Sequence, residues 1–175
     1  YQKYYFISEY DTNLIKQQHK KTNIIFRNYN NKLNITKIKI LRDLCKKKGC
    51  NFFLSNNVKL AIKLKLDGVY LPSFNKSFRH LAYNFKKKFI ILGSAHSLQE
   101  LNIKKFQAVK LFFISSLFKK NKNYLGIYKF KFFENFTKKR LIALGGINEK
   151  NIKKLSLLDI YGYAGISFFQ KKRPL

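Results

Sequence analysis

The sequence predicts a compact (β/α)8 barrel formed by a single domain that covers residues 1–175. Three observations support this fold class. Short apolar runs alternate with helix-type segments about once every 22 residues, which is typical of a parallel sheet with crossover helices. The chain holds eight such units, the number that closes a barrel. No linker divides the chain into a second domain. An open, doubly wound sheet is the alternative architecture.

The strands are recognised as apolar runs short enough to be buried in a parallel sheet. They are predicted at residues 4–8, 23–26, 51–54, 68–71, 89–93, 109–114, 141–144 and 163–167. The helices between them are recognised by apolar spacing and by their end signals. They are predicted at 13–21, from Ile38 to Lys48, at 58–65, at 78–88, from Ser97 through Leu101, near 128–138, and from Asn148 to Leu158.

Local signals explain several of these helix ends. Asn57 can cap the helix at 58–65 with its side-chain oxygen. Ser97 and Glu100 have the spacing of a capping box. Gly49 follows a run of three lysines, where a helix is expected to stop because glycine readily adopts the left-handed conformation.

The net charge of +29 is the most unusual feature of the composition, with 37 Lys and Arg against 8 Asp and Glu. Such a basic excess raises nucleic acid as a partner, but the lysines are spread along the chain and no nucleic-acid-binding motif is present. The joint abundance of Lys, Asn, Ile, Phe and Tyr points to AT-rich codons. We expect a field that attracts anions, a small phosphorylated substrate and no specific nucleic acid. A homo-oligomer is left open.

The hydrophobic share of 46% indicates a globular chain. No run approaches the roughly 18 apolar residues of a membrane span, so we expect no membrane and a cytoplasmic location. The chain does not begin with Met, and we therefore expect residues upstream of Tyr1. Cys45 and Cys50, in CKKKGC, have no second pair and no nearby His. They are predicted to be core thiols beside a helix end.

A phosphate-binding cup is predicted where the last two strands end. Glycine lets the main chain approach a phosphate without a Cβ in the way, and N–H groups at a turn or helix start supply donors. Eight-fold barrels place such a cup after their seventh and eighth strands. A Cβ at Gly146 is expected to occupy the place of the anion. The alternative is that the glycine pair is only a tight turn. The predicted cup consists of Gly145, Gly146, Gly165, Ile166 and Ser167.

Further candidates lie at other predicted strand ends, the edge where barrels carry their chemistry. His96 is the only histidine there, since His19 and His80 fall in predicted helices, and an imidazole moves protons near neutral pH. Arg27 can bind a phosphate or carboxylate through two parallel hydrogen bonds. Alternatively, His96 only bonds a loop carbonyl and Arg27 is an ordinary surface residue. The remaining substrate-binding candidates are Ser94, Asn56, Ser115 and Lys122.

The same strand ends carry no Asp or Glu. We therefore expect no protein-held metal and no cofactor; Mg²⁺ stays open, without its usual carboxylate ligands. A different enzyme class is suggested by Lys110, in the run 109–114, which could form a Schiff base as in aldolases built on phosphate-binding barrels.

Several segments, in chain order, resemble the thiamine phosphate synthase/TenI family. They are YFIS at 5–8, DGVYLP at 67–72, SAHSLQEL at 94–101, SSLF at 115–118, IALGGIN at 142–148 and GIS at 165–167. The similarity covers essentially the whole chain, although no single motif is specific. It implies a (β/α)8 barrel that binds a thiazole phosphate through Gly145, Gly146, Ile166 and Ser167. The synthase joins that thiazole to hydroxymethylpyrimidine diphosphate with Mg²⁺, whereas TenI relatives aromatise the thiazole by proton transfer.

The chain departs from the family pattern where the synthase holds its metal and diphosphate. Ser55-Asn56-Asn57 stand where the synthase has Asn-Asp-Asp, and Phe74-Asn75 stand near its second metal-binding Asp. Arg27 is followed by Asn28-Tyr29 in place of Glu-Lys, and lysines replace the Thr-rich loop at 119–122. A neutral Asn holds Mg²⁺ far less well than a carboxylate.

These departures decide between the activities that the resemblance implies. They favour a TenI-like thiazole tautomerase that uses His96 for proton transfer. The first alternative is a thiamine phosphate synthase with an altered metal site. The second is a degenerate barrel that binds a phosphorylated ligand without turnover.

Overall fold

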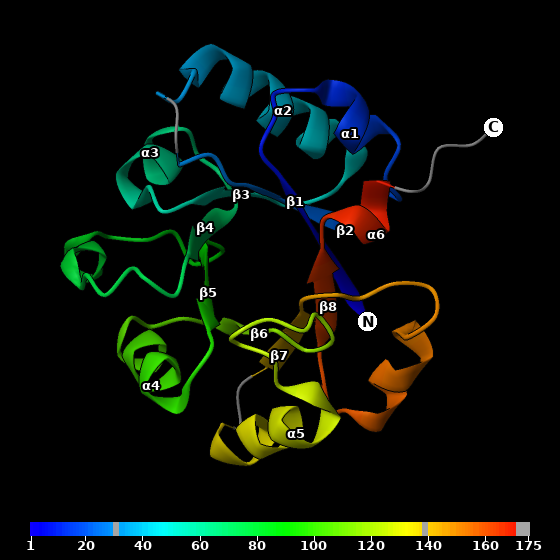
Figure 1. Cartoon of the computed structure of the whole chain (residues 1–175). Coiled ribbons are helices and arrows are strands. Elements are labelled where there is room, and N and C mark those ends of the chain that lie inside the picture. The colour runs from blue at the N-terminus through cyan, green and yellow to red at the C-terminus, as the bar shows by residue number, and fades with distance from the viewer. Residues whose placement is uncertain (30–31, 138–139, 171–175) are drawn as a thin grey trace.

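The structure, a computed structural model, describes residues 1–29, 32–137 and 140–170. It shows a closed barrel of eight parallel strands in chain order, with the helices arranged as a ring outside them (Figure 1). The eighth strand pairs with the first, Tyr5 opposite Gly165, so the sheet has no free edge. The predicted fold class is confirmed.

The strands begin and end within two residues of the predicted ranges. This agreement follows from their composition, because runs such as FFLS and GVYL are buried along their whole length. The strands are β1 (Gln2–Ile7), β2 (Thr22–Phe26), β3 (Phe52–Ser55), β4 (Gly68–Leu71), β5 (Ile90–Ala95), β6 (Leu111–Ser115), β7 (Arg140–Leu144) and β8 (Gly162–Gly165).

The predicted helix caps are also present. Gly49 has a φ of 72° at the end of α2, and Asn57 and Ser97 accept backbone N–H groups at the starts of α3 and α4. The helices are α1 (Thr12–Lys16), α2 (Ile35–Lys48), α3 (Val58–Lys63), α4 (Leu98–Phe106), α5 (Gly126–Phe136) and α6 (Ser167–Gln170), with 3₁₀ helices η1 (Arg79–Ala82) and η2 (Ile152–Leu157). Residue 138, the last of the helix predicted near 128–138, lies outside the described ranges.

The helix predicted at 78–88 is wrong, because this segment contains only the short η1. The His80 side chain is buried, and its Nε2 lies 2.9 Å from the carbonyl oxygen of Gln107. This contact holds the chain against α4 after one turn. Three consecutive lysines at 86–88 also repel one another, which disfavours a longer helix.

The segment after β7 and the segment after β1 also differ from the prediction. Asn148 and Asn151 use their side chains to bond local backbone groups, so the chain forms the 3₁₀ helix η2 and no α-helix. The helix predicted at 13–21 ends at Lys16, and His19 lies beyond it. The last predicted strand ends at Gly165, and Ser167 begins α6.

The interior of the barrel is filled largely by aromatic rings. The Phe113 ring centroid lies 5.1 Å from Tyr4, 6.0 Å from Phe6 and 5.4 Å from Tyr70. A second cluster fills the space between the strands and the surrounding helices. Because these rings fill the barrel interior, no ligand can bind inside it, and the strand ends are where barrels of this kind carry their sites. The interior cluster consists of Tyr4, Phe6, Ile25, Phe53, Tyr70, Leu92, Leu111, Phe113, Ile142 and Ala164.

Two other expectations are decided by the fold. Cys45 and Cys50 are buried free thiols next to the end of α2, as predicted. Lys110 precedes β6 and is exposed at the N-terminal edge of the barrel, so the Schiff-base prediction is wrong. Within the described residues, no helix combines the length and the apolar character that crossing a membrane requires.

Candidate functional site at the barrel mouth

The carboxyl ends of the strands, called the mouth below, bring together several predicted site residues. Side chains two residues apart on a strand point to the same face. Ile25, Phe53, Leu92 and Phe113 point into the barrel, so the residues two positions later point toward the axis at the next level. These residues are Arg27, Ser55, Ser94 and Ser115. The serines are buried and Arg27 is half-buried.

Arg27 is placed to meet an anion. Its guanidinium carbon lies 5.1 Å from the centroid of the Phe6 ring, which holds the side chain over the barrel interior. It forms no ion pair with any described residue. A cavity of about 70 Å³ has both Arg27 and Ile166 in its lining. The mouth therefore has a free cation on the side of β2 that shares a cavity with the turn after β8.

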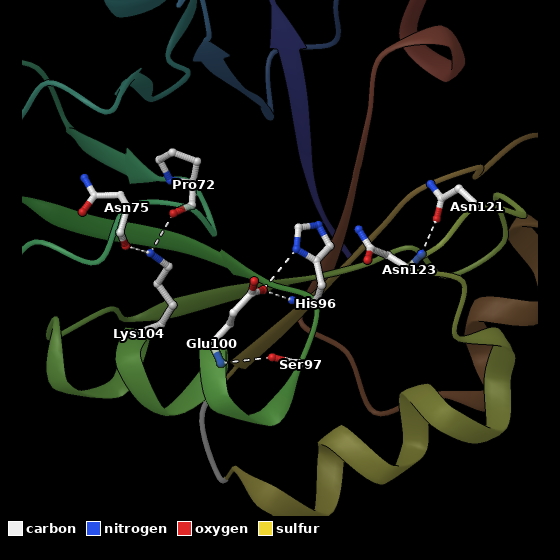
Figure 2. Close-up of polar contacts among 8 residues, drawn as sticks. All are labelled: Pro72, Asn75, His96, Ser97, Glu100, Lys104, Asn121 and Asn123. Carbon is white, nitrogen blue, oxygen red and sulfur yellow. Dashed lines mark hydrogen bonds and ion pairs between the residues drawn. The ribbon is translucent and has the colours of Figure 1, made fainter.

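His96 is held by Glu100 across one turn of α4, as Figure 2 shows. The Glu100 Oε2 atom lies 3.1 Å from His96 Nδ1 and also accepts the His96 backbone N–H at 2.6 Å. When Nδ1 carries the proton, it donates to this carboxylate and leaves the Nε2 lone pair available as a base. The Ser97 half of the predicted capping box is present, since Ser97 Oγ accepts the Glu100 N–H at 3.2 Å, whereas the Glu100 carboxylate bonds His96 and orients its imidazole.

Two tyrosines form a polar wall on the side of β3 and β4. The Tyr29 hydroxyl and the Ser55 hydroxyl are 2.6 Å apart, and the Tyr70 hydroxyl bonds Ser94. Burial raises the pKa of Tyr70 well above its usual value, and burial likewise raises the pKa of Tyr29. Both phenols are therefore neutral hydrogen-bonding groups near neutral pH. Above them, the exposed rings of Tyr29 and Phe74 meet edge to face at 5.4 Å.

Asn56 does not extend freely toward the mouth, because its Oδ1 accepts a hydrogen bond of 2.6 Å from Asn75 Nδ2. The loop that carries Asn75 is anchored to Lys104 of α4, visible in Figure 2. The Lys104 side chain is fully buried, and burial lowers its pKa to about 8. Nothing in the sequence singled out Lys104 among so many lysines.

The two glycines after β7 lack a side chain because the loop after β6 packs directly against them. The prediction was that a phosphate would take this space. Gly145 and Gly146 have φ angles of 103° and 76°, which other residues rarely adopt. A Cβ at Gly145 would lie 2.5 Å from Ser116 Oγ, and a Cβ at Gly146 would collide with the backbone of Lys119. The space beside Gly146 therefore holds the loop after β6, and the expectation that an anion would lie there is wrong.

The turn after β8 is open by comparison. A Cβ at Gly165 would make only ordinary contacts, the nearest at 3.7 Å with Phe168. Within the described ranges, no acceptor receives the backbone N–H of Gly145, Gly146, Ile166 or Ser167. A cavity of about 310 Å³ lies between this turn and the loop after β7, with Asn148, Lys150 and Ser167 in its lining. Of the four residues with unused N–H groups, Ser167 lines this cavity, and the Glu149 carboxylate lies in the lining as well.

The loop after β6 is folded on itself beside the glycine pair. The Ser116 N–H donates to the carbonyl of Asn123 at 2.8 Å, and the Asn123 N–H donates to the Asn121 side chain at 2.9 Å (Figure 2). Ser115 is buried beneath this loop, whereas Lys122 is exposed on it. The structure thus separates these two candidates, and Lys122 can act only from the outer rim.

The described residues contain no group of three or more His, Cys, Asp and Glu side chains that could hold a metal ion. The arrangement instead offers one imidazole with a carboxylate partner, one free guanidinium and a set of backbone donors. Two of its parts were not assigned their roles from sequence, the Glu100 carboxylate and the Tyr29 hydroxyl. The spacing of His96 and Glu100, four residues apart across a helix start, was a usable signal for the first.

Comparison with known proteins adds to this geometry. The family model described as "Thiamine monophosphate synthase" matches residues 10–169. Thiamine-phosphate synthase of Helicobacter pylori strain HPAG1 is 33% identical over 136 residues, covering 74% of this chain and 61% of that protein. Its counterpart in strain Shi470 is 32% identical over 118 residues, covering 64% of this chain and 54% of that protein. The chain thus spans little more than half the length of these relatives.

Among solved structures, a thiamine phosphate pyrophosphorylase from Pyrococcus furiosus superposes with a TM-score of 0.78 at 22% sequence identity. The match covers 95% of this chain and 86% of that one. At this identity the likeness establishes the fold alone, and the family match over residues 10–169 carries the assignment. By that match, the chain belongs to the thiamine monophosphate synthase family.

Proposed function

We propose that this protein is an enzyme of thiamine biosynthesis that binds a thiazole phosphate at the barrel mouth and transfers a proton on its ring. The observation that carries the proposal is the pairing of His96 with Glu100 at 3.1 Å. An imidazole held by a carboxylate through Nδ1 has one defined tautomer, and its Nε2 can accept a proton and return it.

The proposed proton transfer needs no reactant other than the thiazole, the imidazole and solvent. His96 Nε2 removes a proton from one ring position of the non-aromatic thiazole, and the imidazolium or solvent returns a proton to another. No electron pair leaves the substrate, so aromatisation proceeds by tautomerisation alone. The Glu100 carboxylate stabilises the imidazolium formed between the two transfers.

Phosphate binding is proposed at the other side of the mouth. The backbone N–H groups of Gly145, Gly146, Ile166 and Ser167, with the Ser167 hydroxyl, provide donors for phosphate oxygens. Their lack of protein acceptors and the adjoining cavity of about 310 Å³ support this placement. Arg27 shares a cavity with Ile166, so its guanidinium adds a positive charge on the inner side of the same anion.

The test of proton transfer compares matched variants on the non-aromatic thiazole tautomer. His96→Asn should lower the rate by about 10²–10⁴-fold, because a general base is lost. His19→Asn, a substitution away from the mouth, should leave it unchanged. Glu100→Gln should reduce the rate less and alter its pH profile, whereas Glu134→Gln on α5 should do neither. Equal rates for His96→Asn and the parent protein would remove His96 from the mechanism.

A second candidate function is thiamine phosphate synthesis, favoured by the names of the Helicobacter pylori relatives. The assay for it is product formation from hydroxymethylpyrimidine diphosphate and thiazole phosphate, with and without Mg²⁺. Rescue of a thiamine-requiring strain is the independent check. Turnover of both substrates by the parent protein would replace the tautomerase proposal.

A third candidate, binding without turnover, is separated by a thermal-shift screen. The ligands are thiazole phosphate, hydroxymethylpyrimidine diphosphate, thiamine phosphate and plain phosphate, each at two salt concentrations. Stabilisation by thiazole phosphate at both salts supports a built site. Stabilisation by every polyanion that fades with salt indicates only the field of a chain with a net charge of +29.

A further inference from the structure

Two asparagine side chains join the loops that leave neighbouring strands at the mouth. Ser55 at the end of β3 pairs with Tyr70 of β4, so the chains beyond them leave the sheet side by side. Asn56 follows β3 with a φ of 58°, a left-handed conformation that Asn and Asp tolerate better than most residues. Asn75, in the loop after β4, donates from Nδ2 to Asn56 Oδ1 at 2.6 Å.

The loop that carries Asn75 is held by two buried side chains, Lys104 within α4 and Gln107 at the C-terminal end of that helix. Lys104 Nζ donates to the carbonyl oxygens of Pro72 and Asn75, at 2.7 Å each. Gln107 Nε2 donates to the carbonyl of Ser77 at 2.9 Å and to that of Asn75 at 3.1 Å. The backbone of Asn75 is thereby held in place, and its amide is directed at Asn56.

The side-chain oxygens of this pair are already used by protein donors. Asn56 Oδ1 accepts from Asn75, and Asn75 Oδ1 accepts the backbone N–H of Ser77 at 2.9 Å. Both groups are neutral, whereas Mg²⁺ is held by carboxylates. Two carboxylates facing each other at this separation would repel and need a cation between them, but two amides can bond directly because each has a donor and an acceptor. The residues present therefore do not fit the divalent cation that the family resemblance implies.

We propose that the Asn56–Asn75 amide bridge takes the place of a cation bridge in this protein, so that the loops after β3 and β4 are joined without a metal. The mouth is then preorganised at any divalent-cation concentration. Such a bridge shapes the mouth whichever reaction takes place there.

Converting both amides to carboxylates should restore the need for a cation. The variant is Asn56→Asp/Asn75→Asp, and the probe is Mn²⁺, with binding followed by its paramagnetic resonance signal and stability by thermal unfolding. Without Mn²⁺ the double variant should be less stable than the parent, and Mn²⁺ should restore it. Its affinity for Mn²⁺ should exceed that of the parent by about tenfold or more, because affinity for hard cations rises with ligand charge.

The single variants distinguish a bridge from an added charge. Asn56→Asp can still accept from the Asn75 amide, and in Asn75→Asp the Asn56 amide can rotate to donate. Each single variant should therefore remain joined and respond little to Mn²⁺. The response of the double variant should exceed the sum of the two single responses.

A control variant adds the same two charges elsewhere. Asn34→Asp/Asn57→Asp places both carboxylates at helix N-caps, where the parent side chains already accept backbone N–H groups from Lys37 and Leu60. This variant should fold and gain no Mn²⁺ response, although Asn57 adjoins Asn56. An equal response in the control, or Mn²⁺ binding by the parent as tight as that of the double Asp variant, would overturn the proposal. Neither outcome bears on proton transfer by His96, which is measured separately.

Discussion

The two halves of the mouth differ in the groups that form them, which are side chains in one half and mainly backbone N–H groups in the other. On the side of β3, β4 and β5, side chains bond one another, as in the Tyr29–Ser55 and Asn56–Asn75 contacts. On the side of β7 and β8, the donors proposed for phosphate are mostly backbone N–H groups without a protein acceptor, and the glycine turn is shaped by packing against the loop after β6. Side-chain groups change with a single substitution, whereas backbone donors are retained. This difference explains how carboxylates could be absent on one side while the glycine turns on the other side remain.

The largest effect that tests this comparison is expected for Lys104→Met. The substitution leaves the carbonyls of Pro72 and Asn75 without their buried donor, which should lower the free energy of unfolding by about 3 kcal/mol. Lys105→Met is the matched control, since Lys105 donates to the Phe136 carbonyl at an exposed position, and it should cost no more than about 0.5 kcal/mol. Urea unfolding measures both. Equal losses would mean that the side-chain half does not depend on this anchor.

The backbone half is tested by Gly146→Ala. The residue has a φ of 76°, and the new Cβ would collide with the Lys119 backbone, so stability should fall by about 2 kcal/mol. Phosphate affinity of the folded fraction should change less than stability, because the Cβ points at the loop after β6. Phosphate titration of the folded protein, with urea unfolding alongside, gives both quantities. Loss of phosphate binding at unchanged stability would show that the anion does lie beside Gly146.

Alkaline pH should lower the stability of the protein, in part through Tyr70 in the side-chain half. The pKa of buried Tyr70 is raised above its ordinary value of 10.0, so above pH 10 the unfolded chain releases a proton that the folded chain retains. The free energy of unfolding should then fall by up to about 1.4 kcal/mol per pH unit from this group. Lys104 acts in the opposite direction between pH 8 and 10.5, because its pKa is lowered to about 8.

Comparing the parent with Tyr70→Phe isolates the tyrosine, since Lys104 is common to both. The measurement is urea unfolding at a series of pH values from 7 to 11. The parent curve should fall more steeply than that of Tyr70→Phe above pH 10, and the two should run parallel below it. Parallel curves throughout would show that Tyr70 ionises as freely in the folded state as in the unfolded state.

The smallest effect on stability is expected for Gly165→Ala. The new methyl group would make only ordinary contacts, so the change should stay within about 0.5 kcal/mol. Because the residue opens the turn that carries Ile166 and Ser167, the same methyl group should weaken phosphate binding. Calorimetric titration with phosphate and thermal unfolding of the same samples decide this. Unchanged phosphate affinity would place the anion away from β8.

The barrel was predictable because its strands are short runs of uniformly apolar residues. Runs such as FFLS at 52–55 are too short and too uniformly apolar for anything but a buried strand. Gly49 and Ser97 marked helix ends, the first by its left-handed backbone conformation and the second by accepting a backbone N–H group. The helix expected at 78–88 failed because a contact distant in sequence, His80 with Gln107, determined its conformation. Local sequence patterns contain no information about such a partner.

The candidate site was predictable to the extent that the ends of the apolar runs determine where chemistry lies on a barrel. Arg27, Ser94 and His96 lie at or just after predicted strand ends and were found in that way. The partner of His96 was not, because Glu100 resembled a capping residue, and the sequence placed Asn75 near a metal-binding Asp of the family without indicating its bond to Asn56. The role of Gly146 was misjudged for the same reason, since only the fold shows that the loop after β6 occupies the space beside it.

The helix α4 carries two separate tasks on one face, one turn apart. Glu100 near its start orients the imidazole of His96, and Lys104 one turn later fixes the loop that carries Asn75. Because a helix moves as a rigid rod, a tilt or slide of α4 would displace the His96 imidazole and the neighbouring loop together. The position of the imidazole and that of the loop that carries Asn75 are thus mechanically coupled. Ser97 caps α4 by accepting the Glu100 N–H, so it stabilises the helix start on which both contacts depend.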